Sequence, residues 1–241
     1  MEEYEEPREF NFHSKKYQFK FKSSLPLVLL AFVMNFDGWF INIEAKMTKE
    51  LAVKMQEFVL ELKNAIHLFI DSPFAQVIWY DSVTKDGDLS WQDSLNENNQ
   101  VYFDNSDGIF TNYFWKDEKL DECVRNARNR ITDVYVGVDV FGRSKEQTGE
   151  LDSDIPCRKA INAKLSVGLF APGWAFEKST TREEYIELQE SLWASSLTKG
   201  IGSIIPPRKL PSPEKVFTTY FNDGIGHFVS ISNNFIIFNL Y

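Results

Sequence analysis

The sequence from residue 36 to residue 44 reads Phe-Asp-Gly-Trp-Phe-Ile-Asn-Ile-Glu, an apolar run that ends in an amide and a carboxyl group. So short a run of apolar and aromatic residues predicts a strand over Trp39–Glu44. Side chains alternate along a strand, so Asn42 and Glu44 would share one face, roughly 7 Å apart. Their neighbours Ile41 and Ile43 would face the other way and pack on helices. Polar groups at the C-terminal end of such a strand occupy the position of an active site in a barrel of parallel strands.

A second interpretation of this strand end is purely structural. Glu44 could form an ion pair with Lys46, and Asn42 could cap the loop that follows. Polar strand ends of this kind are common, so this segment alone does not distinguish a structural role from a functional one.

Four more apolar runs follow, separated by stretches of helical period; they are Gln76–Ser82, Gly108–Trp115, Asp133–Phe141 and Lys164–Pro172. The first helical stretch begins after Thr48, which can cap it, and the second covers Glu118–Arg130. A third follows Thr181 and Glu184, which have the spacing of a capping box. Strands that alternate with helices predict an α/β fold in which a parallel sheet has helices outside.

The number of strands predicts an incomplete barrel. A closed (β/α)8 TIM-type barrel has eight strands and about 250 residues, whereas five strands are recognisable here. We therefore expect residues 25–200 to form a partial TIM-barrel domain, with about the last five β/α units. Residues 201–241 begin with a proline-rich linker and continue with short runs around Asn222–Gly224 and Asn233–Asn234, which predict the start of a β-rich module. Residues 1–24 stay unassigned.

Composition and charge exclude several classes of function. Twenty-six Lys and Arg against 35 Asp and Glu give a net charge of −9, which argues against a nucleic-acid or anionic-lipid surface. Two cysteines, Cys123 and Cys157, are too few for a disulfide scaffold. Met1 is followed by acidic residues, unlike a secretory signal, and the apolar run Leu25–Met34 is shorter than the roughly 20 residues that span a bilayer. We expect a cytosolic protein.

The sequence predicts neither a metal site nor a cofactor. Its three histidines, His13, His67 and His227, stand far apart, and it has no glycine-rich phosphate loop.

Polar and aromatic residues gather where the predicted strands end. The segments are Trp79–Ser82, Asn112–Trp115, Asp139–Arg143 and Ala171–Trp174, and Trp91 lies in the loop after the first of them. Each segment alone is compatible with core or loop packing. Together, aromatic rings with a few amide and carboxyl groups suit a carbohydrate, because its C–H faces stack on rings while its hydroxyls need directed hydrogen bonds.

These motifs, with Phe36–Glu44 first, occur in the order found in the cytosolic endo-β-N-acetylglucosaminidases of glycoside hydrolase family 85. The resemblance covers roughly Asn35–Asn222, and Thr218–Gly226 resembles the segment that follows the family's barrel. It implies an enzyme that cleaves the GlcNAc-β-1,4-GlcNAc bond of the N-glycan core with retention. Its partners would be N-linked glycans, glycopeptides or free oligosaccharides.

The resemblance also implies roles for individual residues. The substrate's own 2-acetamido oxygen is the nucleophile and forms an oxazoline-type intermediate, an exception to the two-carboxylate rule. Glu44 would be the general acid and then the general base, Asn42 would orient the acetamido group, and Tyr80 would assist there. The implied substrate-binding residues are Trp91, Trp115, Asp139 and Trp174.

Two alternatives stay open at this stage. The chain could be a catalytically inactive glycan-binding fragment, in which the aromatic residues are present but an incomplete barrel does not preorganise the acid. It could instead be an ordinary retaining glycosidase in which Asp81 or Asp139 is a covalent nucleophile.

Overall fold

The computed structural model describes residues 23–194, 199–205, 231–232 and 235–236. The chain divides into two units between Ile204 and Ile205, and each unit is described by itself.

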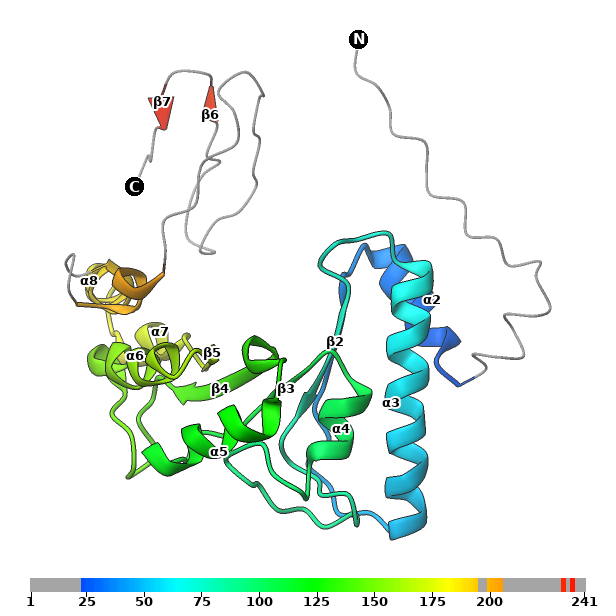
Figure 1. Ribbon diagram of the computed structural model, residues 1–241. Coiled ribbons are helices and arrows are strands. Elements are labelled where there is room, and N and C mark those ends of the chain that lie inside the picture. Colours follow the sequence, from blue (N-terminus) through cyan, green and yellow to red (C-terminus); the bar gives the residue numbers. More distant parts are fainter. Residues whose placement is uncertain (1–22, 195–198, 206–230, 233–234, 237–241) are drawn as a thin grey trace. The chain divides into compact units, whose positions relative to one another are not determined.

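A parallel sheet organises the first unit (Figure 1), and its five strands lie in the order β1-β2-β3-β4-β5. The strands are β1 (Gly38–Ile41), β2 (Gln76–Tyr80), β3 (Gly108–Phe110), β4 (Val134–Asp139) and β5 (Ser166–Phe170). Each strand pairs in parallel with the next one along the chain. The α/β arrangement predicted from the alternating pattern is confirmed.

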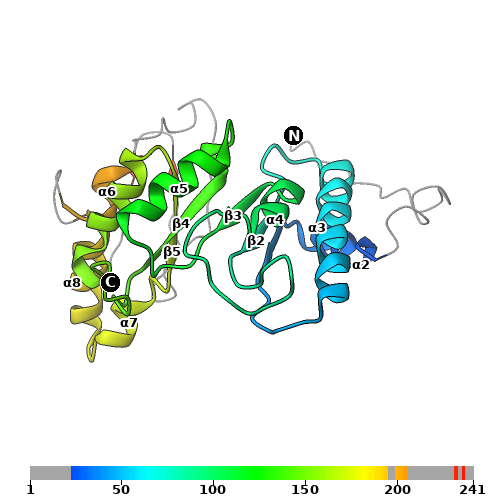
Figure 2. The ribbon, with the colours of Figure 1, turned by 60° about the horizontal axis from the view of Figure 1, so that its bottom comes forward.

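Helices precede, connect and follow the strands. They are α2 (Leu25–Met34), α3 (Lys49–Phe69), α4 (Gln100–Asn105), α5 (Asp117–Ala127), α6 (Asp154–Asn162), α7 (Trp174–Lys178) and α8 (Arg182–Ala194), with 3-10 turns η1 (Ile131–Asp133), η2 (Glu150–Asp152) and η3 (Ile201–Ile204). Helices α2 and α3 pack side by side (Figure 2). The predicted cap of α3 is present, since Thr48 accepts a hydrogen bond from the Leu51 amide at 3.3 Å. At α8 one half of the predicted capping box is present: the Glu184 amide donates to the Thr181 hydroxyl at 3.2 Å, but the Glu184 carboxylate accepts the amide of Thr180 at 2.8 Å.

Strand β1 is shorter than the sequence pattern predicts. Its pairing with β2 ends at Ile41, opposite Trp79, so Asn42 and Glu44 follow the strand instead of belonging to it. Beyond this point the carbonyl of Ile43 accepts a hydrogen bond from the Ser82 hydroxyl at 2.7 Å. A side-chain hydrogen bond thus continues the contact between the two segments after the backbone pairing ends. Asn42 and Glu44 therefore lie at the carboxyl edge of the sheet.

The face of the sheet that packs against helices is a buried apolar core. Val77, Trp79 and Ile109 have no exposed surface, and Val136 has 1%. The ring of Trp79 stacks on Tyr102 of α4 with centroids 4.0 Å apart and planes within 2° of parallel. Burial of such large rings is the main stabilising contribution of this face.

The other face of the sheet carries aromatic side chains from successive strands. The ring of Phe110 lies 5.4 Å from Phe40 and 4.8 Å from Phe170, both edge to face, and Tyr80 lies 5.7 Å from Phe170. Gly168 makes room for this arrangement, because a Cβ at that position would lie 2.1 Å from the Phe110 ring. The ring cluster therefore requires a residue without a side chain at position 168.

The second unit contributes one described pair of strands, β6 (Ile231–Ser232) and β7 (Phe235–Ile236), which are antiparallel. They flank the predicted turn Asn233–Asn234 in sequence, whereas Asn222–Gly224 lies outside the described residues. Within the described part of the chain, no helix combines the length and the apolar character needed to cross a membrane.

Replacing Gly168 with Ala should destabilise the chain by about 1–3 kcal/mol, because the new methyl group must displace a ring that is packed on two sides. The matched control is Gly173→Ala, where no heavy atom lies within 4 Å of the new Cβ and the backbone is already helical. Urea midpoints of the two variants and the parent measure the effect. Equal midpoints for both variants would contradict this account of the aromatic face.

Candidate active site

The carboxyl ends of β1, β2 and β3 meet at a pocket of about 400 Å³. Its lining residues are Glu44, Tyr80, Trp91, Asp93, Asn112, Tyr113 and Phe114. Polar strand ends from separate parts of the sequence come together here because parallel strands all end at the same edge. Three residues singled out from the sequence, Glu44, Tyr80 and Trp91, share this pocket.

Asn42 and Glu44 lie side by side after β1. The Asn42 amide nitrogen is 3.4 Å from a carboxylate oxygen of Glu44, and both residues are exposed. Ile41 and Ile43 pack against the core, as the predicted alternation requires. The purely structural interpretation of this strand end predicts an ion pair between Glu44 and Lys46. In the structure, Lys46 instead pairs with Asp88 at 3.0 Å.

Tyr80 is buried at the base of the pocket, and its hydroxyl donates to the Asn112 side-chain oxygen at 3.1 Å. Burial raises the pKa of Tyr80 well above its ordinary value, and the nearby negative charge of Glu44 raises it further. A hydrogen bond with the Trp91 side chain acts in the opposite direction. Tyr80 therefore serves as a neutral hydrogen-bonding group and not as a base.

Asp81 lies beneath the pocket with 1% of its surface exposed. One of its carboxylate oxygens accepts the amide hydrogens of Gln92, Asp93 and Asn112, at 3.0, 2.8 and 3.5 Å, and the other accepts the Asn99 side-chain amide at 2.9 Å. Burial raises the pKa of Asp81 to about 7, although these hydrogen bonds oppose the shift. The carboxyl group holds the loop that carries Trp91 and is not part of the pocket lining.

The two predicted tryptophans have different environments. Trp91 is 40% exposed and lines the pocket. Trp115 has no exposed surface, and its indole N–H donates to the Gly137 carbonyl at 2.7 Å. The residue before it, Phe114, is 46% exposed and lines the pocket. The aromatic surface after β3 is thus supplied by Tyr113 and Phe114, and Trp115 packs in the core.

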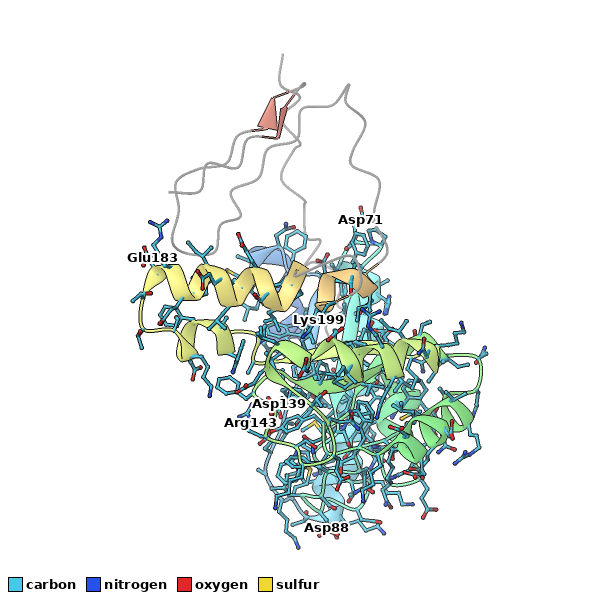
Figure 3. The ribbon with its side chains drawn as sticks, turned by 90° about the vertical axis from the view of Figure 1, so that its left-hand side faces the viewer. Asp71, Asp88, Asp139, Arg143, Glu183 and Lys199 are labelled. Carbon is cyan, nitrogen blue, oxygen red and sulfur yellow. The ribbon has the colours of Figure 1, made fainter. Side chains whose placement is uncertain are left out.

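Asp139 and Trp174 lie at the ends of β4 and β5 and do not line this pocket. Asp139 is paired with Arg143 (Figure 3), whose guanidinium contacts the two carboxylate oxygens at 2.9 and 2.7 Å. Burial alone would raise the pKa of Asp139, but the hydrogen bonds and charge of Arg143 outweigh it and hold the pKa below its ordinary value. Trp174 is 3% exposed, and its indole N–H has no hydrogen-bond partner among the described residues.

Sequence reasoning missed four pocket residues: Asp93, Asn112, Tyr113 and Phe114. The last three belong to the strand-end segment Asn112–Trp115, so the sequence predicts the position of the segment but not which of its side chains line the pocket. Asp93 gave no signal, because it lies in a loop whose path depends on the buried Asp81.

The described residues contain no group of three or more His, Cys, Asp and Glu side chains that could hold a metal ion. His67 contacts Asp107 at 2.8 Å on the opposite edge of the sheet, and His13 and His227 lie outside the described residues.

Comparison with known proteins identifies the family. The sequence profile of glycosyl hydrolase family 85 matches residues 7–229. Cytosolic endo-β-N-acetylglucosaminidase 2 of Arabidopsis thaliana is 40% identical over 206 residues, which are 85% of this chain and 28% of the relative. The cytosolic endo-β-N-acetylglucosaminidase of Homo sapiens is 40% identical over 167 residues, 69% of this chain and 22% of the relative. The chain thus spans between 22% and 28% of the length of these relatives.

A solved structure agrees with the sequence matches. The glycoside hydrolase domain of Endo-D from Streptococcus pneumoniae R6 superposes with a TM-score of 0.52 and 28% identity, over 68% of this chain and 27% of that chain. The resemblance carried by the strand-end motifs is therefore confirmed, and the chain belongs to glycosyl hydrolase family 85.

Proposed function

We propose that this chain carries the catalytic residues of an endo-β-N-acetylglucosaminidase that hydrolyses the GlcNAc-β-1,4-GlcNAc bond of the N-glycan core. The observation that supports it most is that Glu44, with Asn42 beside it, lines a pocket that also contains Tyr80. The relatives are named endo-β-N-acetylglucosaminidases, and they are named cytosolic, so we place this protein in the cytosol too. Its substrates would be N-linked glycans, glycopeptides or free oligosaccharides. The net charge of −9 disfavours nucleic acid and anionic membrane as partners.

The reaction begins with Glu44 as general acid. Its carboxyl proton goes to the glycosidic oxygen as the bond to the anomeric carbon breaks, and the substrate's acetamido oxygen attacks that carbon to form an oxazoline-type intermediate. Glu44, now a carboxylate, takes a proton from water, which opens the intermediate with net retention. Asn42 and Tyr80 hydrogen-bond to the acetamido group as charge develops there.

Two other carboxylates are poorly suited to act as a covalent nucleophile. Asp81 is buried and accepts four N–H donors, and Asp139 is buried and held by Arg143. Burial and these hydrogen bonds disfavour the approach of either carboxylate to an anomeric carbon, which favours the substrate-assisted route. Trp91, with Tyr113 and Phe114, would stack on sugar rings. Trp115, Asp139 and Trp174 would act on the substrate only by supporting the strand ends.

We further propose that the five-stranded sheet is part of a (β/α)8 barrel. The support is a sheet in which each parallel strand lies beside the next in sequence, and the match to part of a glycoside hydrolase domain. On this proposal residues 25–200 form the partial barrel domain, and residues 201–241 form a linker and the start of a β-rich domain.

Replacing Glu44 with Gln should reduce oligosaccharide release from a high-mannose glycopeptide by at least about 100-fold, because the amide cannot donate or take up the catalytic proton. The assay compares the 241-residue chain, this variant and the control Glu57→Gln, which changes an exposed residue of α3. Equal release by Glu44→Gln and the parent would disprove the role of Glu44. Glycan binding without release by the parent would favour a glycan-binding fragment.

The substrate-assisted route predicts that the chain converts a glycan oxazoline into the free oligosaccharide, because the oxazoline is its own intermediate. Product is followed by chromatography and mass spectrometry. A glycosyl adduct on a peptide that contains Asp81 or Asp139 would instead establish a covalent nucleophile and contradict the route.

The two tryptophans should respond differently to replacement. Trp91→Ala should raise KM by about tenfold with little change in stability, since an exposed stacking surface is lost. Trp115→Phe should lower stability by about 1–3 kcal/mol with KM unchanged, since the Gly137 carbonyl loses its buried donor. Steady-state kinetics and urea midpoints measure both effects; the reverse pattern would show that Trp115 contacts the sugar.

A further inference from the structure

A line of side-chain hydrogen bonds connects the loop after β2 to the base of the pocket. A carboxylate oxygen of Asp93 accepts the Asn112 side-chain N–H at 2.7 Å and the Phe114 backbone N–H at 3.1 Å. The Asn112 side-chain oxygen in turn accepts the Tyr80 hydroxyl at 3.1 Å. Asp93, Asn112 and Tyr80 all line the pocket that contains Glu44. We call these three residues the relay.

The chemistry of the three groups fixes the direction of every bond. A carboxylate only accepts hydrogen bonds, so the Asn112 amide must point its NH₂ group toward Asp93. The amide oxygen then faces Tyr80, and the tyrosine hydroxyl must donate to it. The proton of Tyr80 is thereby engaged by Asn112, and the lone pairs of the Tyr80 oxygen are left for other donors, of which the Trp91 side chain is one.

The buried carboxylate of Asp81 holds two residues of the relay in place. The same oxygen of Asp81 accepts the backbone N–H groups of Asp93 and Asn112, at 2.8 and 3.5 Å, so both residues have a common buried anchor. Asp93 has a positive φ of 56°, in the left-handed region that Asn and Asp adopt more readily than other side-chain-bearing residues.

We propose that Asp93 is a positioning residue that acts through Asn112 to fix the orientation of the Tyr80 hydroxyl. The proposal rests on the proposed function, because it assigns Tyr80 to the substrate and gives Asp93 no contact with the reacting atoms. Tyr80 then meets the acetamido group as a hydrogen-bond acceptor. An acceptor there leaves the acetamido oxygen free for its attack and stabilises the N–H group as that group becomes positively charged.

A double-mutant cycle separates positioning from a general structural role. Asp93→Ala should lower kcat/KM for glycopeptide about tenfold, the effect of losing one orienting hydrogen bond. Asp93→Asn should restore most of this loss, because its amide oxygen can accept the same two N–H donors. In a Tyr80→Phe background, Asp93→Ala should have less than about a twofold effect, since no hydroxyl is left to orient. Asp104→Ala, a carboxylate of α4 outside the pocket, is the control.

Two outcomes would overturn the proposal: full activity of Asp93→Ala, or losses that multiply in the double variant. Urea midpoints of the single variants establish that each is folded before its kinetics are compared.

A spectroscopic measurement keeps this test independent of the reaction. Asp93→Ala and Tyr80→Phe should each shift the ¹H–¹⁵N signals of the Asn112 side-chain amide, whereas Asp104→Ala should leave them unchanged. If the parent chain releases no oligosaccharide, the proposed function fails while the relay is still tested by these signals. Asn112 signals that do not respond to either variant would refute the relay.

Discussion

A single buried carboxylate determines how the site is assembled. Asp81 follows β2 directly, and its two oxygens collect hydrogen bonds from the loop at Gln92 and Asp93, from Asn99, and from Asn112 after β3. All the donors are uncharged N–H groups, so no ion pair compensates for the burial of this group. The cost of burying it is offset by the hydrogen bonds from four oriented donors. Removal of this acceptor would free the loop that carries Trp91 and Asp93 together.

The two faces of the sheet differ in composition: one face forms the apolar core, and the other carries the aromatic rings that extend to the pocket. Aliphatic residues and Trp79 fill the helix-facing side, and those of the central strands are almost completely buried. The opposite side is built of phenyl and phenol rings in edge-to-face contact, with the phenol of Tyr80 at the end that reaches the pocket. The same stack of rings therefore both packs the sheet and sets the position of a polar group. This coupling explains why a small residue, Gly168, is needed at its centre.

The sequence alone predicted the class of fold and the main polar pair. Alternating apolar runs and helical stretches identified five parallel strands, and strand periodicity placed Asn42 and Glu44 together, because these patterns depend on local geometry. Short helices such as α4 and α6 were not recognised, since their burial comes from tertiary contacts and not from a long periodic stripe. The same limit applies to the site: Trp115 was expected at the pocket, but burial and a carbonyl partner at Gly137 direct it into the core. Asp93 could not be found from the sequence, because its position depends on hydrogen bonds to a residue 12 positions away.

The strand order has a consequence for the way the chain acquires its structure. Every strand of the sheet pairs with its immediate successor in sequence, and a helix or loop closes each crossover. Within the described sheet, the chain segments that must be closed into loops are therefore all of moderate length, and no pairing joins the first strand to the last. Assembly can begin at any β/α/β pair and extend in both directions, as new units add to an existing edge during synthesis. The nascent polypeptide would then already hold Glu44, Tyr80 and the Asp81 anchor in place before the last strands leave the ribosome.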